Sequence, residues 1–222
     1  MKRTRAAVLA ALTTIAPLAA PPPAAAAEPC RMRLAIADVR IDRPLVRVPA
    51  RTVATCDLYA WSAGWNLRWS GGTAFLGFAD SVPVATITWP DTRTPGTVRV
   101  TGAGASDALE TTWVQEPTTF TARRASGVLL RALRTGRHVV TDGIVRAYAP
   151  DRDGFAGWAG AAVRLESRPA DGGDWVTLST YRADANGRIP QHRWFAPQPR
   201  VFRLVAAGTP AILPAVGTPA RR

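Results

Sequence analysis

Ala161-Ala-Val-Arg-Leu-Glu-Ser-Arg168 is the stretch that decides the fold, because apolar and polar side chains alternate along it. Val163 and Leu165 fall on one side of an extended chain, whereas Arg164 and Glu166 fall on the other. A strand with one buried side and one side facing solvent requires this period of two. The stretch therefore predicts an antiparallel β-strand.

Turn residues divide this strand from its neighbours. Gly172-Gly-Asp174 separates it from a second stretch, Trp175 to Tyr181, and Asn186-Gly187 follows soon after. Asn-Gly favours the positive φ angles of a tight hairpin turn. Short strands with this rhythm fill both halves of the chain, at about seven per hundred residues. We therefore expect an all-β protein with two tandem immunoglobulin-like β-sandwich domains. A transthyretin-like topology has the same strand count and stays open.

The first 27 residues have the composition of an export signal. Met1-Lys-Arg-Thr-Arg5 is positively charged, Ala6 to Ala20 is apolar, and Ala25-Ala-Ala27 offers small residues for cleavage before Glu28. A retained N-terminal anchor is the alternative. No later stretch is long and apolar enough to span a bilayer, so we expect no membrane span in the mature chain. The sequence predicts a secreted, extracellular protein.

The mature chain is long enough for two sandwich domains. We place the boundary at Glu116-Pro117-Thr-Thr119, between two alternating stretches. The predicted organisation is a signal peptide, a first sandwich, a second sandwich and a loosely ordered tail, at residues 1–27, 28–116, 117–207 and 208–222.

Two cysteines, Cys30 and Cys56, remain after cleavage, and we expect them to pair in the first domain because an exported chain meets an oxidising environment. A metal or redox role for the two thiols lacks partners. The sequence has no Cys-x-x-Cys motif, and His138 and His192 lie far away in the chain.

The chain is basic. Loss of Lys2, Arg3 and Arg5 with the signal lowers the formal net charge from +12 to +9. The positive electrostatic field of such a chain attracts anionic polymers. Five arginines that gather in a short segment are candidates for binding an anionic polymer, namely Arg123, Arg124, Arg131, Arg134 and Arg137. A solvated face is the more ordinary interpretation of this cluster, and it has no DNA-reading motif or interleaved aromatics, so we expect no nucleic-acid partner.

Aromatic side chains form a second candidate. In one extended strand, Trp61, Trp65 and Trp69 would line a single face and could stack on sugar rings. If Ala63-Gly64 makes a turn, the same residues become core residues of a hairpin, which is the interpretation that we favour because sandwich cores commonly bury a Trp. Trp158 lies in a loop-like segment and completes the possible aromatic platform.

Catalytic and metal-binding motifs have little support. Asp151-x-Asp153-Gly154 and Asp184-x-Asn186-Gly187 each begin like a calcium loop, but Ala162 and Phe195 occupy the position of the bidentate glutamate. No nucleophile elbow or zinc-protease helix is present. We therefore expect no metal, no cofactor and no enzymatic activity. A cryptic hydrolase that uses these acidic residues stays open, as does a small-ligand carrier.

Several segments of the second half resemble a known module. They are Trp158-x-Gly160-x-x-Val163-x-Leu165-x-x-Arg168, Trp175-Val-x-Leu, Thr180-x-x-Ala-Asp184-Ala-Asn-Gly187-Arg and Phe202-Arg-Leu. Together they are similar to an immunoglobulin-like or prealbumin-like β-sandwich module of secreted actinobacterial proteins. The resemblance covers roughly residues 118–209 and implies an exported surface or matrix protein without a catalytic residue. We expect a secreted, non-catalytic binding or structural module whose partner is cell-envelope material, such as an anionic wall polymer or a polysaccharide.

Overall fold

The computed structural model describes residues 29–57, 59–109 and 113–222. Its regular elements are β-strands, apart from one 3-10 turn, η1 (Pro150–Arg152), so the prediction of an all-β fold is confirmed. The predicted signal peptide, 1–27, lies outside the described residues. In the described part of the chain, no helix is long and apolar enough to cross a membrane.

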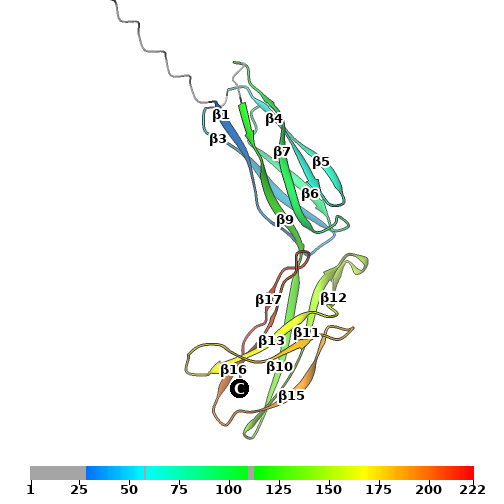
Figure 1. Cartoon of the computed structure of the whole chain (residues 1–222), viewed down its shortest axis with the longest axis vertical. Coiled ribbons are helices and arrows are strands. Elements are labelled where there is room, and N and C mark those ends of the chain that lie inside the picture. Colours follow the sequence, from blue (N-terminus) through cyan, green and yellow to red (C-terminus); the bar gives the residue numbers. More distant parts are fainter. Residues whose placement is uncertain (1–28, 58, 110–112) are drawn as a thin grey trace, which may run out of the picture.

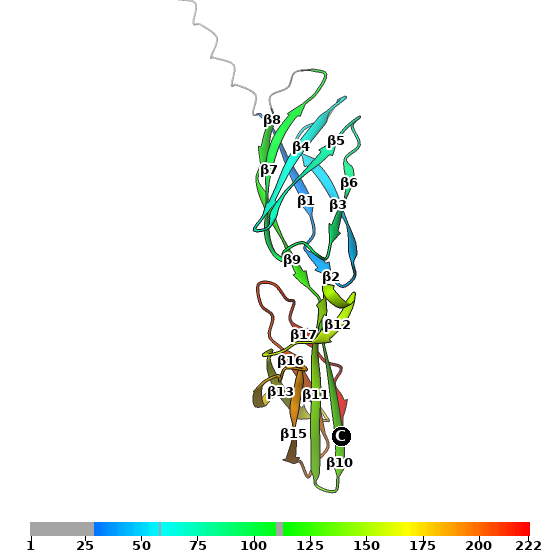
Figure 2. The ribbon, with the colours of Figure 1, turned by 90° about the vertical axis from the view of Figure 1, so that its right-hand side faces the viewer.

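The strands form two lobes that lie end to end (Figures 1 and 2). Two sheets build the N-terminal lobe. The first has the order β6 (Val84–Pro90), β3 (Leu45–Ala54), β1 (Cys30–Ile36) and β8 (Trp113–Glu116). The second has the order β5 (Gly72–Phe78), β4 (Ser62–Trp69), β7 (Gly96–Ser106), β9 (Thr118–Arg124) and β2 (Val39–Ile41). Strands β8 and β2 join their sheets in parallel, and the other pairs are antiparallel.

One core fills the space between these two sheets. Trp65 of β4 and Trp89 of β6 are fully buried in it, because every second residue of each strand points inward. Packing of Met32 and Leu34 from β1 extends the core along the lobe. The N-terminal lobe is therefore a filled sandwich.

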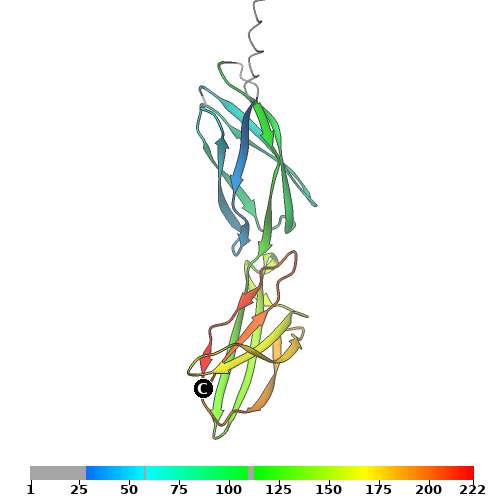
Figure 3. The same ribbon diagram turned by 60° about the vertical axis from the view of Figure 1, so that its left-hand side comes forward.

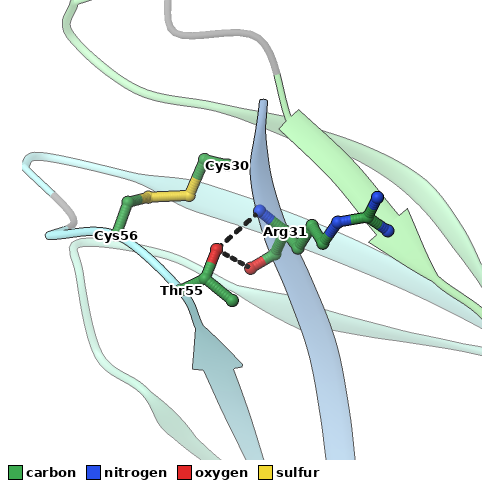
Figure 4. The surroundings of a disulfide bond; sticks show 4 residues. All are labelled: Cys30, Arg31, Thr55 and Cys56. Carbon is green, nitrogen blue, oxygen red and sulfur yellow. Dashed lines mark hydrogen bonds between the residues drawn. A yellow bond between two sulfur atoms is a disulfide. The ribbon is translucent and has the colours of Figure 1, made fainter. Parts of the chain in front are cut away.

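The predicted disulfide between Cys30 and Cys56 is confirmed. It joins the start of β1 to the chain just after β3, at one end of the lobe (Figure 4). Beside it, the Thr55 hydroxyl accepts a hydrogen bond of 3.0 Å from the backbone N–H of Arg31. The disulfide thus links the ends of two strands, β1 and β3, that already pair in the sheet.

Two further sheets build the C-terminal lobe. In one, β11 (His138–Ala149) pairs with three strands, β10 (Ser126–Thr135), β12 (Gly154–Gly157) and β15 (Arg188–Phe195). The other has the order β14 (Val176–Arg182), β13 (Ala162–Pro169), β16 (Arg200–Ala206) and β17 (Ala215–Val216), with β18 (Ala220–Arg221) also on β16. The buried residues of the C-terminal lobe form two smaller clusters, around Leu165 and around Phe202.

The alternating stretch forms β13 with Val163 and Leu165 buried, as predicted, but Glu166, which we expected to face solvent, is buried as well. The hairpin predicted at Asn186-Gly187 is wrong, because the strands on either side of it, β14 and β15, belong to different sheets. The Asp184 carboxylate instead accepts the N–H groups of Asn186 and Arg188, at 2.8 and 2.7 Å, and shapes a turn between the sheets.

The chain passes between the lobes through Ala125, which joins β9 directly to β10. The Ala125 N–H donates to the Ile41 carbonyl at 2.8 Å, and its carbonyl accepts from the Tyr148 N–H at 2.8 Å. Since β9 pairs with β2 and β7, it belongs to the N-terminal lobe, and the predicted boundary at Glu116-Pro117 lies one strand too early. The position of the boundary depends on which strands pair, and the alternation within a single stretch does not indicate its pairing partner.

Tyr148 connects the two lobes. It lies on β11 but is buried in the core of the N-terminal lobe, and its hydroxyl donates to Oδ2 of the buried Asp91 at 2.8 Å. Burial, together with this hydrogen bond, raises the pKa of Tyr148 to about 12. The contact fixes one end of β11 against the loop after β6.

The tail, 208–222, differs from the loosely ordered segment that we predicted. Strands β17 and β18 pair with β16, and the end of the chain runs along the lobe in red (Figure 3). The Leu213 N–H donates to the Arg124 carbonyl at 2.9 Å, next to the passage between the lobes. The prolines and few apolar residues of the tail suggested weak anchoring, whereas backbone pairing holds it.

Candidate binding face

The five arginines of the predicted cluster do not form one surface. Arg123 and Arg124 end β9, where the Arg123 guanidinium lies 3.7 Å from Oδ2 of Asp38. The backbone N–H of Thr121 donates to Asp38 at 2.7 Å, and this hydrogen bond is the main cause that lowers the pKa of that carboxyl. Both arginines are half-buried. The Arg123 guanidinium thus has an acidic neighbour, and both side chains are partly covered by the fold.

The other three arginines lie on the second lobe and differ from one another. Arg131 makes a bidentate pair with Asp142 across β10 and β11. Arg137 is exposed in the turn between these strands. The Arg134 guanidinium donates to four backbone carbonyls, those of Gly136, Ala196, Gln198 and Arg222. Arg134 thus holds loops and the chain end together, and its guanidinium donors are already used within the fold.

The tryptophans of the predicted platform belong to the cores. Trp61 and Trp65 are buried, and Trp69 packs on the same core, with the Arg93 guanidinium 4.8 Å from its ring centroid. Trp158 packs against the larger core cluster of the second lobe. The core interpretation is therefore the one that the structure supports, and these four side chains offer no exposed aromatic platform.

The acidic turn residues also have local roles. Asp151 lies within η1 and Asp153 follows it as the C-cap, and Asp184 caps the turn before β15. Over residues 29–57, 59–109 and 113–222, no group of three or more His, Cys, Asp or Glu side chains could hold a metal ion. These loops therefore give no support to a calcium site.

A charged cluster that the sequence did not predict lies on the outer side of β13 and β16. The buried carboxylate of Glu166 accepts from Nε of Arg164 at 3.1 Å and from Nε of Arg203 at 2.8 Å. Trp175 covers it, with the Arg203 guanidinium 3.9 Å and that of Arg168 5.0 Å from its ring centroid. Burial opposes ionisation of Glu166, but the two arginines hold its pKa below the ordinary value. The charged groups of this cluster are therefore already paired with one another.

An open polar face lies on the outer side of β5, β4, β7 and β9. Alternation in β4 turns Trp65 and Leu67 inward, so Asn66 and Arg68 point to solvent. Register then places Arg68 directly opposite Arg99 of β7. Threonines extend this row on both sides, with Thr73 opposite Arg68 and Thr119 opposite Arg99. We call these four residues the arginine row.

The two arginines of this row face each other without an acidic partner. Within the described part of the chain, neither Arg68 nor Arg99 makes an ion pair or a side-chain hydrogen bond. Like charges directly opposite each other on neighbouring strands destabilise a sheet. An anion bound between them would relieve that repulsion and accept hydrogen bonds from both guanidinium groups.

Phe75 supplies an exposed ring next to the arginine row. It is 66% exposed and lies opposite Asn66, two residues along β5 from Thr73. Its ring lies over the backbone of Gly64, where a Cβ would come within 2.7 Å of it. A shallow hollow of about 680 Å³ opens beside the ring. A second hollow, of about 590 Å³, is lined by Arg99, Thr101, Pro117, Thr118 and Thr119.

Sequence reasoning missed this face, although part of the signal was present. The alternation from Ser62 to Trp69 already separates Arg68 from the tryptophans. The sequence around Arg99 or Phe75 does not indicate that these residues lie near Arg68. Their proximity depends on the pairing of β4 with β7 and with β5.

No protein-family model and no curated protein matches this chain. The likeness of residues 118–209 to secreted actinobacterial modules therefore stays a prediction.

Proposed function

We propose that this protein is a secreted, non-catalytic binding module that recognises anionic polysaccharide of the cell envelope through the outer face of β5, β4, β7 and β9. The observation that carries the proposal is the pair Arg68 and Arg99, opposed without a carboxylate and lying beside the exposed ring of Phe75. The disulfide between Cys30 and Cys56 supports an oxidising environment.

The chemistry of this face fits a sugar polymer that carries carboxylates or phosphates. A guanidinium binds a carboxylate or a phosphate with two parallel hydrogen bonds. The ring of Phe75 offers a flat apolar surface for the C–H face of a sugar, and Asn66 and Thr101 lie opposite each other in the adjacent row. Neighbouring rows on the face lie about 7 Å apart, which is close to the size of one sugar ring.

The openness of the face fits a polymer better than a small ligand. Its hollows are shallow, and no enclosed site lies beside Phe75 or Arg99 in the described residues. A long chain can lie across several strands and make many weak contacts, of which the ionic ones weaken as salt rises.

The test is co-sedimentation of the purified protein with isolated bacterial cell walls and, in parallel, titration with polygalacturonate and with a neutral glucan, each over a salt series. The test variant is Arg68→Gln with Arg99→Gln. The matched control is Arg47→Gln with Arg51→Gln, which removes two exposed arginines from the outer side of β3 in the other sheet. We expect the first variant to lose about tenfold or more in affinity for the anionic polymers, and the control to lose little.

A second variant separates stacking from charge. Phe75→Ala should weaken binding without changing its salt dependence, because it removes an apolar contact and no charge. Equal losses in the Arg68/Arg99 variant and the Arg47/Arg51 variant would refute the proposed face, and would leave only a general attraction by the positive field. No binding to any anionic polymer at low salt would refute the proposed function.

A further inference from the structure

The outer side of β10, β11 and β15 in the C-terminal lobe has a different character. Register aligns Leu129 with Ile144, and Leu133 with Val140, across β10 and β11. Phe195 of β15 lies opposite His138. All of these side chains point away from the core, because Val128, Ala132 and Val139 fill the inward positions.

Three large apolar side chains on this face are strongly exposed. Leu129 is 61%, Leu133 is 64% and Phe195 is 66% exposed. The outward positions of an antiparallel sheet that faces solvent are normally polar. Leu129 and Leu133 lie about 13 Å apart along β10, and the ion pair of Arg131 with Asp142 lies between them, so a partner would meet two apolar patches. Exposed apolar side chains that are bordered by polar ones are typical of interaction sites.

The charges on the face are almost all positive. Strands β10, β11 and β15 contain a single acidic residue, Asp142, and Arg131 already occupies its carboxylate. Arg188 and Arg193 line the β15 side, opposite Ile144 and Val140. In the described chain neither has an acidic partner.

A hollow of about 520 Å³ lies beside the ion pair of Arg131 and Asp142. It forms where an irregularity between Thr141 and Gly143 interrupts the pairing of β11 with β15. Leu129 and Ile144 line one part of it, and Arg188 and Gln191 line another. A side chain that protrudes from a partner could fill this hollow, with its apolar part on the leucine and its charge near Arg188.

We infer that this face docks an acidic protein partner that presents apolar side chains between carboxylates. Apolar contacts would cover Leu129, Leu133 and Phe195, and carboxylates would pair with Arg188 and Arg193. Complementary charge of this kind selects partners and speeds encounter. The face is separate from the arginine row, which lies in the other lobe, so the inference does not depend on the proposed function.

Two other occupants fit the charges and the shape less well. A second copy of the chain would bring Arg188 and Arg193 near their own counterparts, with only the already paired Asp142 to offset them. Such like-charge contacts oppose association. An anionic bilayer would satisfy the arginines, but a broad lipid surface does not present the protruding group that the hollow beside Arg131 accommodates.

The experiment uses the full chain and a defined probe, an eight-residue peptide in which leucine and glutamate alternate. Binding is mapped by backbone NMR shifts. The test variant carries Leu129→Ser, Leu133→Ser and Phe195→Ser, all at exposed positions. The matched control carries Val176→Ser and Val216→Ser, which are exposed apolar residues of the other sheet of this lobe. A peptide with lysine in place of glutamate tests the charge requirement.

We expect shifts confined to β10, β11 and β15, a loss of affinity of about tenfold or more in the test variant, and no change in the control. The lysine peptide should bind at least tenfold more weakly. Equal binding of the two peptides, or equal losses in the two variants, would overturn the inference. So would self-association through this face in sedimentation velocity, or binding to phosphatidylglycerol vesicles that the three substitutions abolish.

Discussion

The two lobes have the same design of two packed sheets, but different devices stabilise them. The N-terminal lobe has one continuous core with the buried rings of Trp65 and Trp89 and a disulfide at one end. The C-terminal lobe divides its buried residues into two smaller clusters and adds a charged cluster around Glu166 on an outer face. In both lobes sheet geometry fixes where side chains point, and the chemistry of those side chains decides what stabilises each sandwich.

The outer faces differ in the same way. The face of β5, β4, β7 and β9 presents arginine, threonine and asparagine around one phenylalanine, whereas the face of β10, β11 and β15 presents leucines beside arginines. Both faces are positive, so charge alone does not distinguish them. Apolar content does, and it is the reason why we propose a sugar polymer for the first face and a protein partner for the second.

The largest expected effect comes from truncating a buried side chain, and one such truncation in the core of each lobe tests the comparison. Trp65→Ala should destabilise the N-terminal lobe by about 4 kcal/mol, because it empties the centre of a single core. Leu204→Ala should destabilise the C-terminal lobe by about 3 kcal/mol. Urea titration with peptide-resolved hydrogen exchange reports each lobe separately. If either substitution lowers protection equally in both lobes, the lobes unfold as one cooperative unit and the comparison fails.

Removing the disulfide should have the next largest effect. Cys30→Ser with Cys56→Ser frees a loop with a sequence separation of 26. Loop-closure arithmetic gives a loss of about 3.5 kcal/mol in the free energy of unfolding of the N-terminal lobe. The same urea titration measures it, with reduced wild type as a second sample. Protection of β13 and β16 should stay unchanged, and a matching loss there would contradict separate stabilisation of the lobes.

Tyr148→Phe tests the contact between the lobes. It leaves the buried Asp91 carboxylate without its donor, and should cost about 2 kcal/mol. The pKa of Tyr148 is raised from 10.0 to about 12, so its contribution is complete below pH 10 and is lost as pH rises through 12. Thermal melts between pH 8 and 12 measure both effects. A variant whose stability falls as steeply as that of the wild type over this range would show that another group titrates.

The smallest expected effect concerns Glu166. Its two arginines hold the pKa below 4.5, so the stability that it contributes is present above pH 4.5 and is lost as pH falls through the lowered value. Glu166→Gln should cost about 1.5 kcal/mol at pH 7, with the loss confined to the C-terminal lobe, and should flatten the acid limb of its stability. Hydrogen exchange at pH 3 to 7 checks this. An unchanged acid limb would assign the acid sensitivity to other carboxylates.

Part of this fold follows directly from local pattern. Alternation around Val163 and Leu165 predicts a strand and its buried side, and the pair Cys30 and Cys56 in a chain with an export-like leader predicts the disulfide. The same pattern misplaces the passage between the lobes, since β9 looks like an opening strand but pairs backward with β2 and β7. It also misses the tail, whose strands rest on backbone pairing to β16.

The class of fold and the inward side of each well-patterned strand follow from the sequence, because both depend on neighbours one or two residues away. The cysteine pair follows because Cys30 and Cys56 are the two cysteines of a chain with an export-like leader. Which side chains meet depends on how the strands pair in the folded protein. Strand pairing separated the arginines that cluster in the sequence, buried Trp61 and Trp65, and brought Arg68 opposite Arg99. Cross-strand register joins residues that are far apart in the chain, so pairing, and not proximity in the sequence, sets the composition of a surface.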